Sequence, residues 1–375
     1  MTVAVVVIVA AGFVYVYPTL TSKPAPKAGP ITAIDHFISA QMQQQRFSGT
    51  VLIAQNGRIL LDKGYGWADE GQRLRNQPST RFRIASITKQ FTAMAILLLQ
   101  EQGRLHVQDP ICRYITGCPA TWNTITIQHV LTHTSGIPEY ATTLLMQQPA
   151  SPAQLIAAFE SEPLDFAPGA KFSYSNSGYV ILGSIIEKLS GETYSEFLQQ
   201  AIFRALHLSN TGYDQNFPPL PEHATGYKQP WVKADYVDMS VPFAAGALYS
   251  TVDDLYRWDA ALFNRTFASS DSVTQMFTPQ VTSCDQGGTP CTASECDAQR
   301  VNCYSYGYGW FLGQFPVDPQ YVRVIWHSGG LPGFVSLNLY HPDQKLTLIV
   351  LSNLETFNWN LMAEAVESAF IRHRI

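Results

Sequence analysis

The sequence lacks the charge distribution that would indicate a polyanion as its partner. Only 14% of the 375 residues are charged, the formal net charge is -5, and neither sign forms a long run. A protein that binds a phosphate backbone needs a basic surface, so this composition argues against nucleic-acid binding. The chain also contains no internal repeat.

Several catalytic signatures are absent as well. There is no Gly-x-Ser-x-Gly elbow, no Walker-type Gly-x4-Gly-Lys-Ser/Thr, no His-Glu-x-x-His and no convincing Gly-x-Gly-x-x-Gly. The α/β-hydrolase, P-loop and zincin classes therefore lose their main support. We expect no cofactor and no metal.

What the chain does contain is a large apolar fraction, 46% of its residues. Such a chain can bury a sizeable core in one large composite domain or in two. Residues 3–17 stand apart as an uninterrupted apolar or small-residue stretch, and a Lys- and Pro-containing segment follows. We interpret residues 1–22 as a signal or membrane anchor and residues 23–30 as a linker.

This N-terminal stretch predicts an extracytoplasmic protein that is periplasmic, secreted or attached to a membrane. It is shorter than the roughly 20 residues of a spanning helix, and no Lys or Arg precedes it. A buried N-terminal helix is the alternative interpretation.

The six cysteines support the same compartment. Two form a close pair, and four crowd a stretch rich in Gly, Thr and Asp that we interpret as a disulfide-rich insertion at about residues 283–303. The gaps between these four differ from the short Cys-x2-Cys knuckles of zinc modules, so disulfides are favoured over a metal site, with the pairing left open. Disulfides fit an oxidising environment. The close pair is Cys112 and Cys118, and the four are Cys284, Cys291, Cys296 and Cys303.

Strand signals occur at both ends of the chain. Residues 50–54 and 59–61 are apolar runs separated by a segment with Asn56-Gly57, a pair typical of a tight hairpin. Near the other end, residues 335–340 alternate and residues 346–351 form a buried-strand run. A terminal helix is expected at residues 361–371.

Helix signals dominate between these strands, from about residue 80 to 225. Residues 86–102 are apolar nearly all round and end at Gly103, which predicts a central buried helix. Further helices are expected at residues 179–189 and 194–206. The order predicts an α+β fold over residues 31–375, in which an antiparallel sheet formed by the N- and C-terminal segments is flanked by helices, with a mainly helical region inserted.

One candidate nucleophile lies at the start of the central helix. Ser86-Ile87-Thr88-Lys89 is the only Ser-x-x-Lys in the chain. Ser86 falls where backbone N–H groups lack partners within the helix, and Lys89 is close enough on the same face to reach its hydroxyl. A desolvated lysine can take the proton of a serine. The alternative is an N-cap serine followed by a solvated lysine.

Two further segments carry groups that suit an active site. Tyr174 and Asn176 lie two residues apart on a polar loop, so in an extended conformation they project to the same side. His327-Ser328-Gly329-Gly330 ends an apolar run, where glycines let a substrate backbone approach closely. In isolation, each segment has an ordinary alternative. For the first it is a turn with a packing tyrosine and a capping asparagine, the commoner use of both residues, and for the second it is turn punctuation.

Together, Ser-Ile-Thr-Lys, Tyr-Ser-Asn and His-Ser-Gly resemble, in this order, the motifs of the serine β-lactamase and penicillin-binding-protein superfamily. Tyrosine in the second motif is similar to the class C β-lactamase and DD-peptidase branch, which also includes esterases. Secondary resemblances extend over nearly everything after residue 45, among them residues 131–136, 246–251 and 306–310. The resemblance implies a β-lactamase/transpeptidase-like fold.

The resemblance also implies roles for individual residues. Ser86 would be acylated, and Lys89 and Tyr174 would share the proton transfers, with the identity of the base left open. The backbone N–H groups of Ser86 and Gly330 would form the oxyanion hole. Asn176 and Gly329 would bind the substrate. His133 and Ser135 resemble loop-forming residues of the family and are interpreted as structural.

The third motif departs from the family pattern because it begins with His327, where β-lactamases and DD-peptidases usually have lysine. A histidine of ordinary pKa is mostly uncharged at neutral pH, so a fixed cation for a substrate carboxylate is missing. His327 remains a candidate catalytic residue.

We therefore predict a serine hydrolase that acts through an acyl-enzyme on ester or amide bonds, the latter like those of D-amino-acid peptides. Its expected partner is a small-molecule or peptide substrate. A true β-lactamase and a non-catalytic penicillin-binding-like module are the alternatives.

Overall fold

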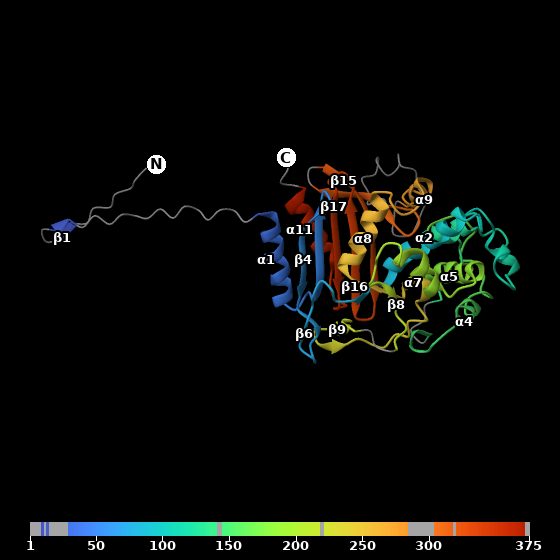
Figure 1. The fold of residues 1–375 in the computed structure, drawn as a ribbon, viewed down its shortest axis with the longest axis horizontal. Coiled ribbons are helices and arrows are strands. Elements are labelled where there is room, and N and C mark those ends of the chain that lie inside the picture. The colour runs from blue at the N-terminus through green and yellow to red at the C-terminus, as the bar shows by residue number, and fades with distance from the viewer. Residues whose placement is uncertain are drawn as a thin grey trace.

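The structure, a computed structural model, describes residues 9–10, 13–14, 29–140, 145–217, 221–283, 304–317 and 320–371. Its centre is an antiparallel sheet of eight strands (Figure 1). In spatial order the strands are β12 (Val281–Ser283), β13 (Tyr304–Tyr306), β14 (Phe311–Val317), β15 (Gln320–Leu331), β16 (Phe334–His341), β17 (Leu346–Ser352), β3 (Gly49–Gln55) and β4 (Arg58–Tyr65).

The two ends of the chain meet in this sheet, as the sequence predicts. The predicted hairpin joins β3 to β4, and Asn56 and Gly57 both have positive φ, 53° and 76°. The C-terminal strand β17 then pairs with β3, with Leu348 opposite Ile53. The α+β fold with a sheet built from both terminal segments is confirmed.

Every residue of β3 is buried because both faces of the sheet are covered. Val51 and Ile53 belong to a core beneath α1 (Pro30–Gln43) and α11 (Trp359–Phe370). Leu52 and Ala54 point the opposite way, into the larger core that the sheet shares with the helical region. Figure 1 shows α1 and α11 on one side of the sheet and the other helices on the opposite side.

The central helix α2 (Thr88–Glu101) is buried as predicted, and Gly103 follows it with φ 68°. Its start differs from the prediction, since Ser86 lies in a separate 3-10 turn, η1 (Ala85–Ile87). Ala85 has φ 47° there, which breaks the helical path one residue before the nucleophile candidate. The chain therefore turns sharply at Ser86.

The remaining helices lie on the side of the main sheet that α2 covers, and several of them pack against α2. They are α3 (Ile127–Leu131), α4 (Pro152–Ala157), α5 (Asn176–Ser190), α6 (Tyr194–Leu198), α7 (Phe243–Gly246), α8 (Val252–Phe263) and α9 (Ser270–Met276). The helix expected over residues 194–206 is shorter, because α6 passes into the π-helical turn η5 (Gln199–Phe203). The terminal helix expected at 361–371 is α11, which begins two residues earlier.

Small strands and turns complete the fold. A three-stranded sheet has the order β7 (Phe82–Arg83), β11 (Leu248–Ser250), β8 (Gly212–Tyr213). Three strand pairs are β5 (Trp67–Asp69) with β6 (Leu74–Arg75), β9 (Tyr227–Gln229) with β10 (Val232–Lys233), and β1 (Val9–Ala10) with β2 (Phe13–Val14). The other short turns are η2 (Ile111–Arg113), η3 (Ala120–Trp122) and η4 (Leu145–Gln147).

Two predictions fall mainly outside the described residues. The four clustered cysteines lie there, and so does most of the predicted signal or anchor segment. The close pair is described, and Cys112 forms a disulfide with Cys118. No helix within the described ranges has the length and apolar character needed to cross a bilayer.

Candidate active site

Ser86 lies where the turn η1 packs against the rim of the main sheet. Ser336 of β16 donates a hydrogen bond to the carbonyl of Ile84, 2.8 Å, and fixes this turn. A Cβ atom at Gly329 would lie 2.5 Å from the Ile84 oxygen and 2.9 Å from the Ser86 nitrogen, so only glycine lets β15 approach. The close approach predicted for Gly329 is thus made by the protein's own backbone. At Gly330 a Cβ atom would meet open space.

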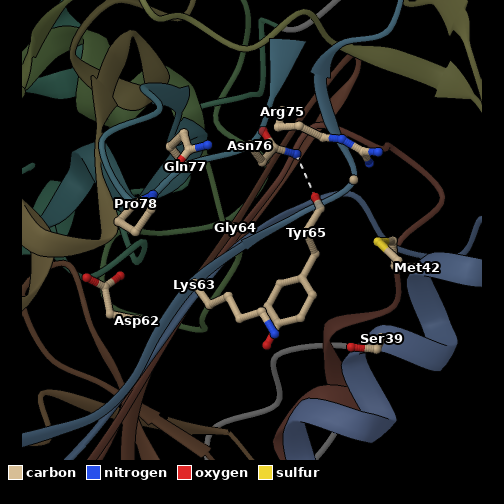
Figure 2. Close-up of a pocket in the computed structure, with 11 residues that line it drawn as sticks. Ser39, Met42, Asp62, Lys63, Gly64, Tyr65, Arg75, Asn76, Gln77 and Pro78 are labelled. Carbon is tan, nitrogen blue, oxygen red and sulfur yellow. Dashed lines mark hydrogen bonds between the residues drawn. The ribbon is translucent and has the colours of Figure 1, made fainter. Parts of the chain in front are cut away.

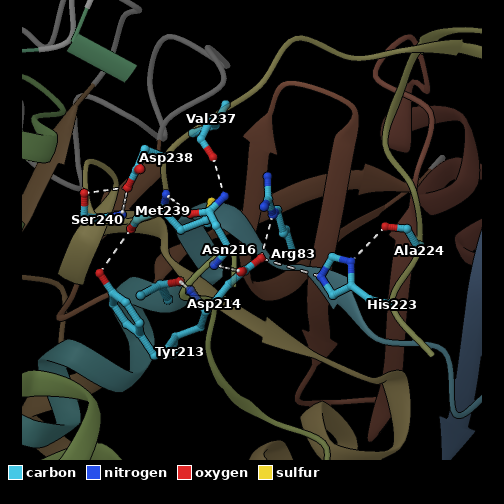
Figure 3. A network of polar contacts seen from close by, with 12 residues as sticks. Arg83, Tyr213, Asp214, Asn216, His223, Ala224, Val237, Asp238, Met239 and Ser240 are labelled. Carbon is cyan, nitrogen blue, oxygen red and sulfur yellow. Dashed lines mark hydrogen bonds and ion pairs between the residues drawn. The ribbon is translucent and has the colours of Figure 1, made fainter. Parts of the chain in front are cut away.

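The strand that leads into Ser86 is held by a partly buried ion pair. Arg83 Nε donates to Asp214 Oδ2 at 2.8 Å, and His223 Nε2 lies 3.7 Å from the same oxygen (Figure 3). The backbone N–H of Asn216 donates to the other oxygen of Asp214. This network ties β7 to the segment that follows β8. The backbone three residues before Ser86 is therefore fixed.

Lys89 is fully buried, and its ammonium nitrogen has three acceptors. It donates to Ser86 Oγ at 3.1 Å, to Asn176 Oδ1 at 2.7 Å and to the carbonyl oxygen of Ala245 at 2.8 Å. Burial lowers the pKa of Lys89 to about 7, although the carboxylate of Glu139 opposes this shift. The amine therefore changes its charge near neutral pH, where a general base is most effective.

Tyr174 forms one wall around this amine. The Lys89 nitrogen lies 4.8 Å from the centre of its ring. Burial raises the pKa of Tyr174, while the nearby Ser86 hydroxyl acts in the opposite direction. Its buried Oη forms no well-aligned hydrogen bond to any described residue. Tyr174 is thus a protonated phenol at neutral pH, beside the Ser86 hydroxyl.

Asn176 is the first residue of α5. Tyr174 and Asn176 can project to the same side only if the residue between them is extended, and Ser175 is extended. Its backbone N–H donates to Glu139 Oε2 at 2.6 Å, and its side-chain Nδ2 donates to Glu139 Oε1 at 3.1 Å. The amide oxygen of Asn176 accepts the hydrogen bond from Lys89. Glu139 is not among the predicted site residues, because it lies 37 residues from Asn176 and no spacing pattern links the two.

His133 and Ser135 have the loop-forming contacts expected of them. His133 has φ 58°, its Nδ1 accepts the N–H of Ser175 at 3.0 Å, and its carbonyl accepts the N–H of Ser173 at 2.8 Å. Ser135 Oγ accepts the N–H of Ile137. The loop thereby supports the segment that carries Tyr174.

His327 is only 1% exposed, and both of its ring nitrogens are engaged. Nδ1 lies 2.6 Å from the carbonyl oxygen of Ser328, and Nε2 lies 3.1 Å from Tyr306 Oη. A carbonyl only accepts, so Nδ1 carries the proton and Nε2 accepts from the phenol. Burial, followed by the nearby Lys89, lowers the pKa of His327 to about 3. The ring is neutral and has no free nitrogen for a substrate.

Five of the six predicted positions around the nucleophile therefore meet in one place. Lys89, Asn176 and Tyr174 surround the Ser86 side chain, while Gly329 contacts its backbone and His327 lies behind the rim. Within the described residues, no cluster of three or more His, Cys, Asp or Glu could hold a metal ion.

A separate cleft of about 490 Å³ lies where the edge strand β4 meets α1 (Figure 2). Lys63 and Tyr65 of β4 form part of its wall, and both donate hydrogen bonds to Asp35 of α1. None of the predicted site residues lines this cleft. It is not the candidate active site.

The fold and the arrangement around Ser86 define a serine hydrolase of the penicillin-recognising type. The chain belongs to the beta-lactamase family, since the family model described as Beta-lactamase matches residues 34–369. Penicillin-binding protein 4* of Bacillus subtilis is 31% identical over 334 residues, which cover 84% of this chain and 69% of that protein.

Solved structures agree with this family assignment. A penicillin-binding protein from Bacillus halodurans has a TM-score of 0.74 at 28% identity and covers 89% of this chain and 98% of its own. A D-stereospecific amidohydrolase from Streptomyces sp. has the same fold, with a TM-score of 0.74 at 24% identity over 91% of this chain and 98% of its own.

Proposed function

We propose that this protein is an exported serine hydrolase that forms an acyl-enzyme on Ser86 and cleaves esters or amides like those of D-amino-acid peptides. The observation that carries the proposal is the 3.1 Å contact of the Ser86 hydroxyl with a buried lysine whose pKa is lowered to about 7. A serine hydroxyl is a poor nucleophile until a neighbouring base takes its proton.

Lys89 is the better candidate for this base. When it is neutral, its two remaining hydrogens suffice for Asn176 Oδ1 and the Ala245 carbonyl, and its lone pair faces Ser86. Lys89 takes the hydroxyl proton as Ser86 Oγ bonds to the substrate carbonyl carbon. The resulting oxyanion is held by the N–H groups of Ser86 and Gly330, each donor contributing about 3 kcal/mol of transition-state stabilisation.

Collapse of this intermediate breaks the bond to the leaving group. The leaving oxygen or nitrogen takes a proton from the Tyr174 phenol, which is protonated at neutral pH and lies beside Ser86. Lys89 returns a proton to Tyr174. A water molecule then attacks the acyl carbon and loses its proton to the same pair. Collapse breaks the bond between the acyl carbon and Ser86 Oγ, and the pair returns the proton to Oγ as the acid product leaves.

Neutral His327 directs the choice of substrate. Because its pKa is lowered to about 3 and both nitrogens are engaged, it offers no positive charge for a carboxylate. Its role is to position the rim of β15, and β-lactams with their carboxylate should be poor substrates. Because the Streptomyces protein of the same fold is a D-stereospecific amidohydrolase, amides of D-configured compounds are a class worth testing.

The chemistry is tested with a fluorophosphonate probe. Wild type should be labelled, Ser86→Ala should not, and Ser161→Ala, which changes an exposed serine, should be labelled like wild type. Unlabelled wild type would favour a non-catalytic binding module. Nitrophenyl esters, D-Ala-D-Ala peptides and a chromogenic cephalosporin are then compared on one preparation. Rapid cephalosporin turnover would instead support a true β-lactamase.

Export is the second part of the proposal. The apolar stretch at residues 3–17 and the disulfide between Cys112 and Cys118 both support an extracytoplasmic location, periplasmic, secreted or membrane-attached. Residues 1–30 fused to alkaline phosphatase, which is active only outside the bacterial cytoplasm, should give an active reporter. A fusion of residues 31–60 is the matched control, and an inactive 1–30 fusion would contradict export.

A further inference from the structure

Glu139 is an exposed carboxylate at the candidate active site, and both of its oxygens bind one residue. Oε2 accepts the backbone N–H of Asn176, and Oε1 accepts its side-chain Nδ2. Asn176 begins α5, where a backbone N–H has no partner within the helix and where the helix dipole favours a negative charge. Glu139 therefore caps α5 and binds the Asn176 side chain at the same time.

These two hydrogen bonds from Asn176 to Glu139 determine which end of the Asn176 amide faces Lys89. The oxygen and nitrogen of an amide are nearly equal in size, so shape alone does not choose between them. A carboxylate only accepts, and an ammonium only donates. With Glu139 on one side, Nδ2 must face the carboxylate, and Oδ1 must face Lys89 at 2.7 Å.

Glu139 is also the charged group that acts on Lys89 across the site. Burial keeps the neighbouring histidines neutral by lowering their pKa values, and it keeps the neighbouring tyrosines protonated by raising theirs. Among the described residues around Lys89, the neutral titratable groups are His133, Tyr174, Tyr179, Tyr306 and His327. Glu139 stabilises the protonated amine against its burial.

We propose that Glu139 is a positioning residue that orients Lys89 through Asn176 and sets the pH at which Ser86 becomes reactive. The proposal rests on the proposed function, because it assigns Lys89 and Tyr174 the proton transfers at Ser86. Glu139 touches neither Ser86 nor Lys89 with a hydrogen bond of its own in the described structure. Glu139 acts on Lys89 through the hydrogen-bonded amide of Asn176 and through its own negative charge.

The test compares Glu139→Gln with wild type in the pH dependence of fluorophosphonate labelling. Glutamine lacks the charge, and its amide group places a donor against one of the two Asn176 donors. At low salt the acid limb of the labelling profile, where the rate rises as Lys89 loses its proton, should move down by about half to one pH unit, since Glu139 raises the pKa of Lys89. The plateau rate should fall by about tenfold or more because the amine is less well oriented.

The salt dependence of labelling is a measurement that would not change if the role of Glu139 were purely structural. In wild type, 0.5 M NaCl should screen the exposed carboxylate and lower the acid limb, whereas Glu139→Gln should respond little. Glu139→Asp keeps the charge and should retain most of the limb position. Glu364→Gln makes the same charge change at an exposed position on α11, behind the sheet, and should match wild type.

Lysine-selective NMR separates this proposal from the proposed function, because it follows the titration of Lys89 without any reaction. The Lys89 signal is assigned by its loss in Lys89→Met. A lower titration midpoint in Glu139→Gln, with wild type unlabelled by the probe, would overturn the catalytic proposal alone. The role of Glu139 would be overturned by a different result. Wild type would be labelled, and a folded Glu139→Gln variant would have the same acid limb and the same Lys89 titration midpoint as wild type.

Discussion

We predict that a buried carboxyl on α8 makes the stability of this protein depend strongly on pH. Asp259 is 1% exposed, its Oδ1 accepts a hydrogen bond from Asn338 at 2.7 Å, and its Oδ2 has no partner among the described residues. Burial raises the pKa of Asp259 to about 8, and the Asn338 contact only partly opposes this. Asp259 is therefore protonated in the folded state at neutral pH.

The sign of the effect follows from proton binding. Between the unfolded pKa of 3.8 and the folded pKa of about 8, the folded state holds one proton that the unfolded state has released. The free energy of unfolding therefore falls as pH rises, by about 1.4 kcal/mol per pH unit, and levels off above pH 8. At pH 7 the accumulated loss approaches ~4 kcal/mol.

Asp259→Asn removes this titration and leaves the hydrogen bond from Asn338 in place. We expect the variant to match wild type near pH 4.5, to within about 1 kcal/mol, and to exceed its stability by up to ~4 kcal/mol at pH 7. Urea unfolding at pH 4.5, 6, 7 and 8, followed by tryptophan fluorescence, measures the difference. Asp271→Asn, an exposed aspartate on α9, is the control. A difference between Asp259→Asn and wild type that is independent of pH would refute the reasoning.

Three further predictions concern the site and its supports. For an ester substrate, kcat/KM should rise through a pH of about 7 as Lys89 loses its proton, and Lys89→Met should lower it by about 10²–10⁴-fold; a wild-type profile that is flat from pH 5 to 9 would contradict this. Tyr306→Phe leaves Nε2 of His327 without its donor, so urea unfolding should show a loss of about 1–3 kcal/mol, and unchanged stability would exclude that hydrogen bond. Replacing Cys112 and Cys118 by serine opens a short loop and should cost about 2 kcal/mol, seen as a lower Tm; an unchanged Tm would argue against the bond.

Local signals made much of the fold predictable. The Asn56-Gly57 turn specifies its hairpin because both residues must adopt positive φ, and few other residue pairs do so readily. The helix after Ser86 was predictable from its apolar periodicity, although its first turn was not. The break at Ala85, with φ 47°, has no sequence signal, because alanine is an ordinary helix former.

The sequence alone determined the pair at the centre of the site. Ser86 and Lys89 are three residues apart, so the path of a single turn brings them together. Tyr174 and Asn176 likewise flank a single extended residue, Ser175. Only the tertiary structure decided what these groups can do. Three features depend on burial and on contacts between residues that are distant in the chain. They are the pKa of Lys89, the hydrogen bonds from Asn176 to Glu139, and the hydrogen bonds of both His327 ring nitrogens. Desolvation and charge act through space, so no spacing pattern along the sequence reports them.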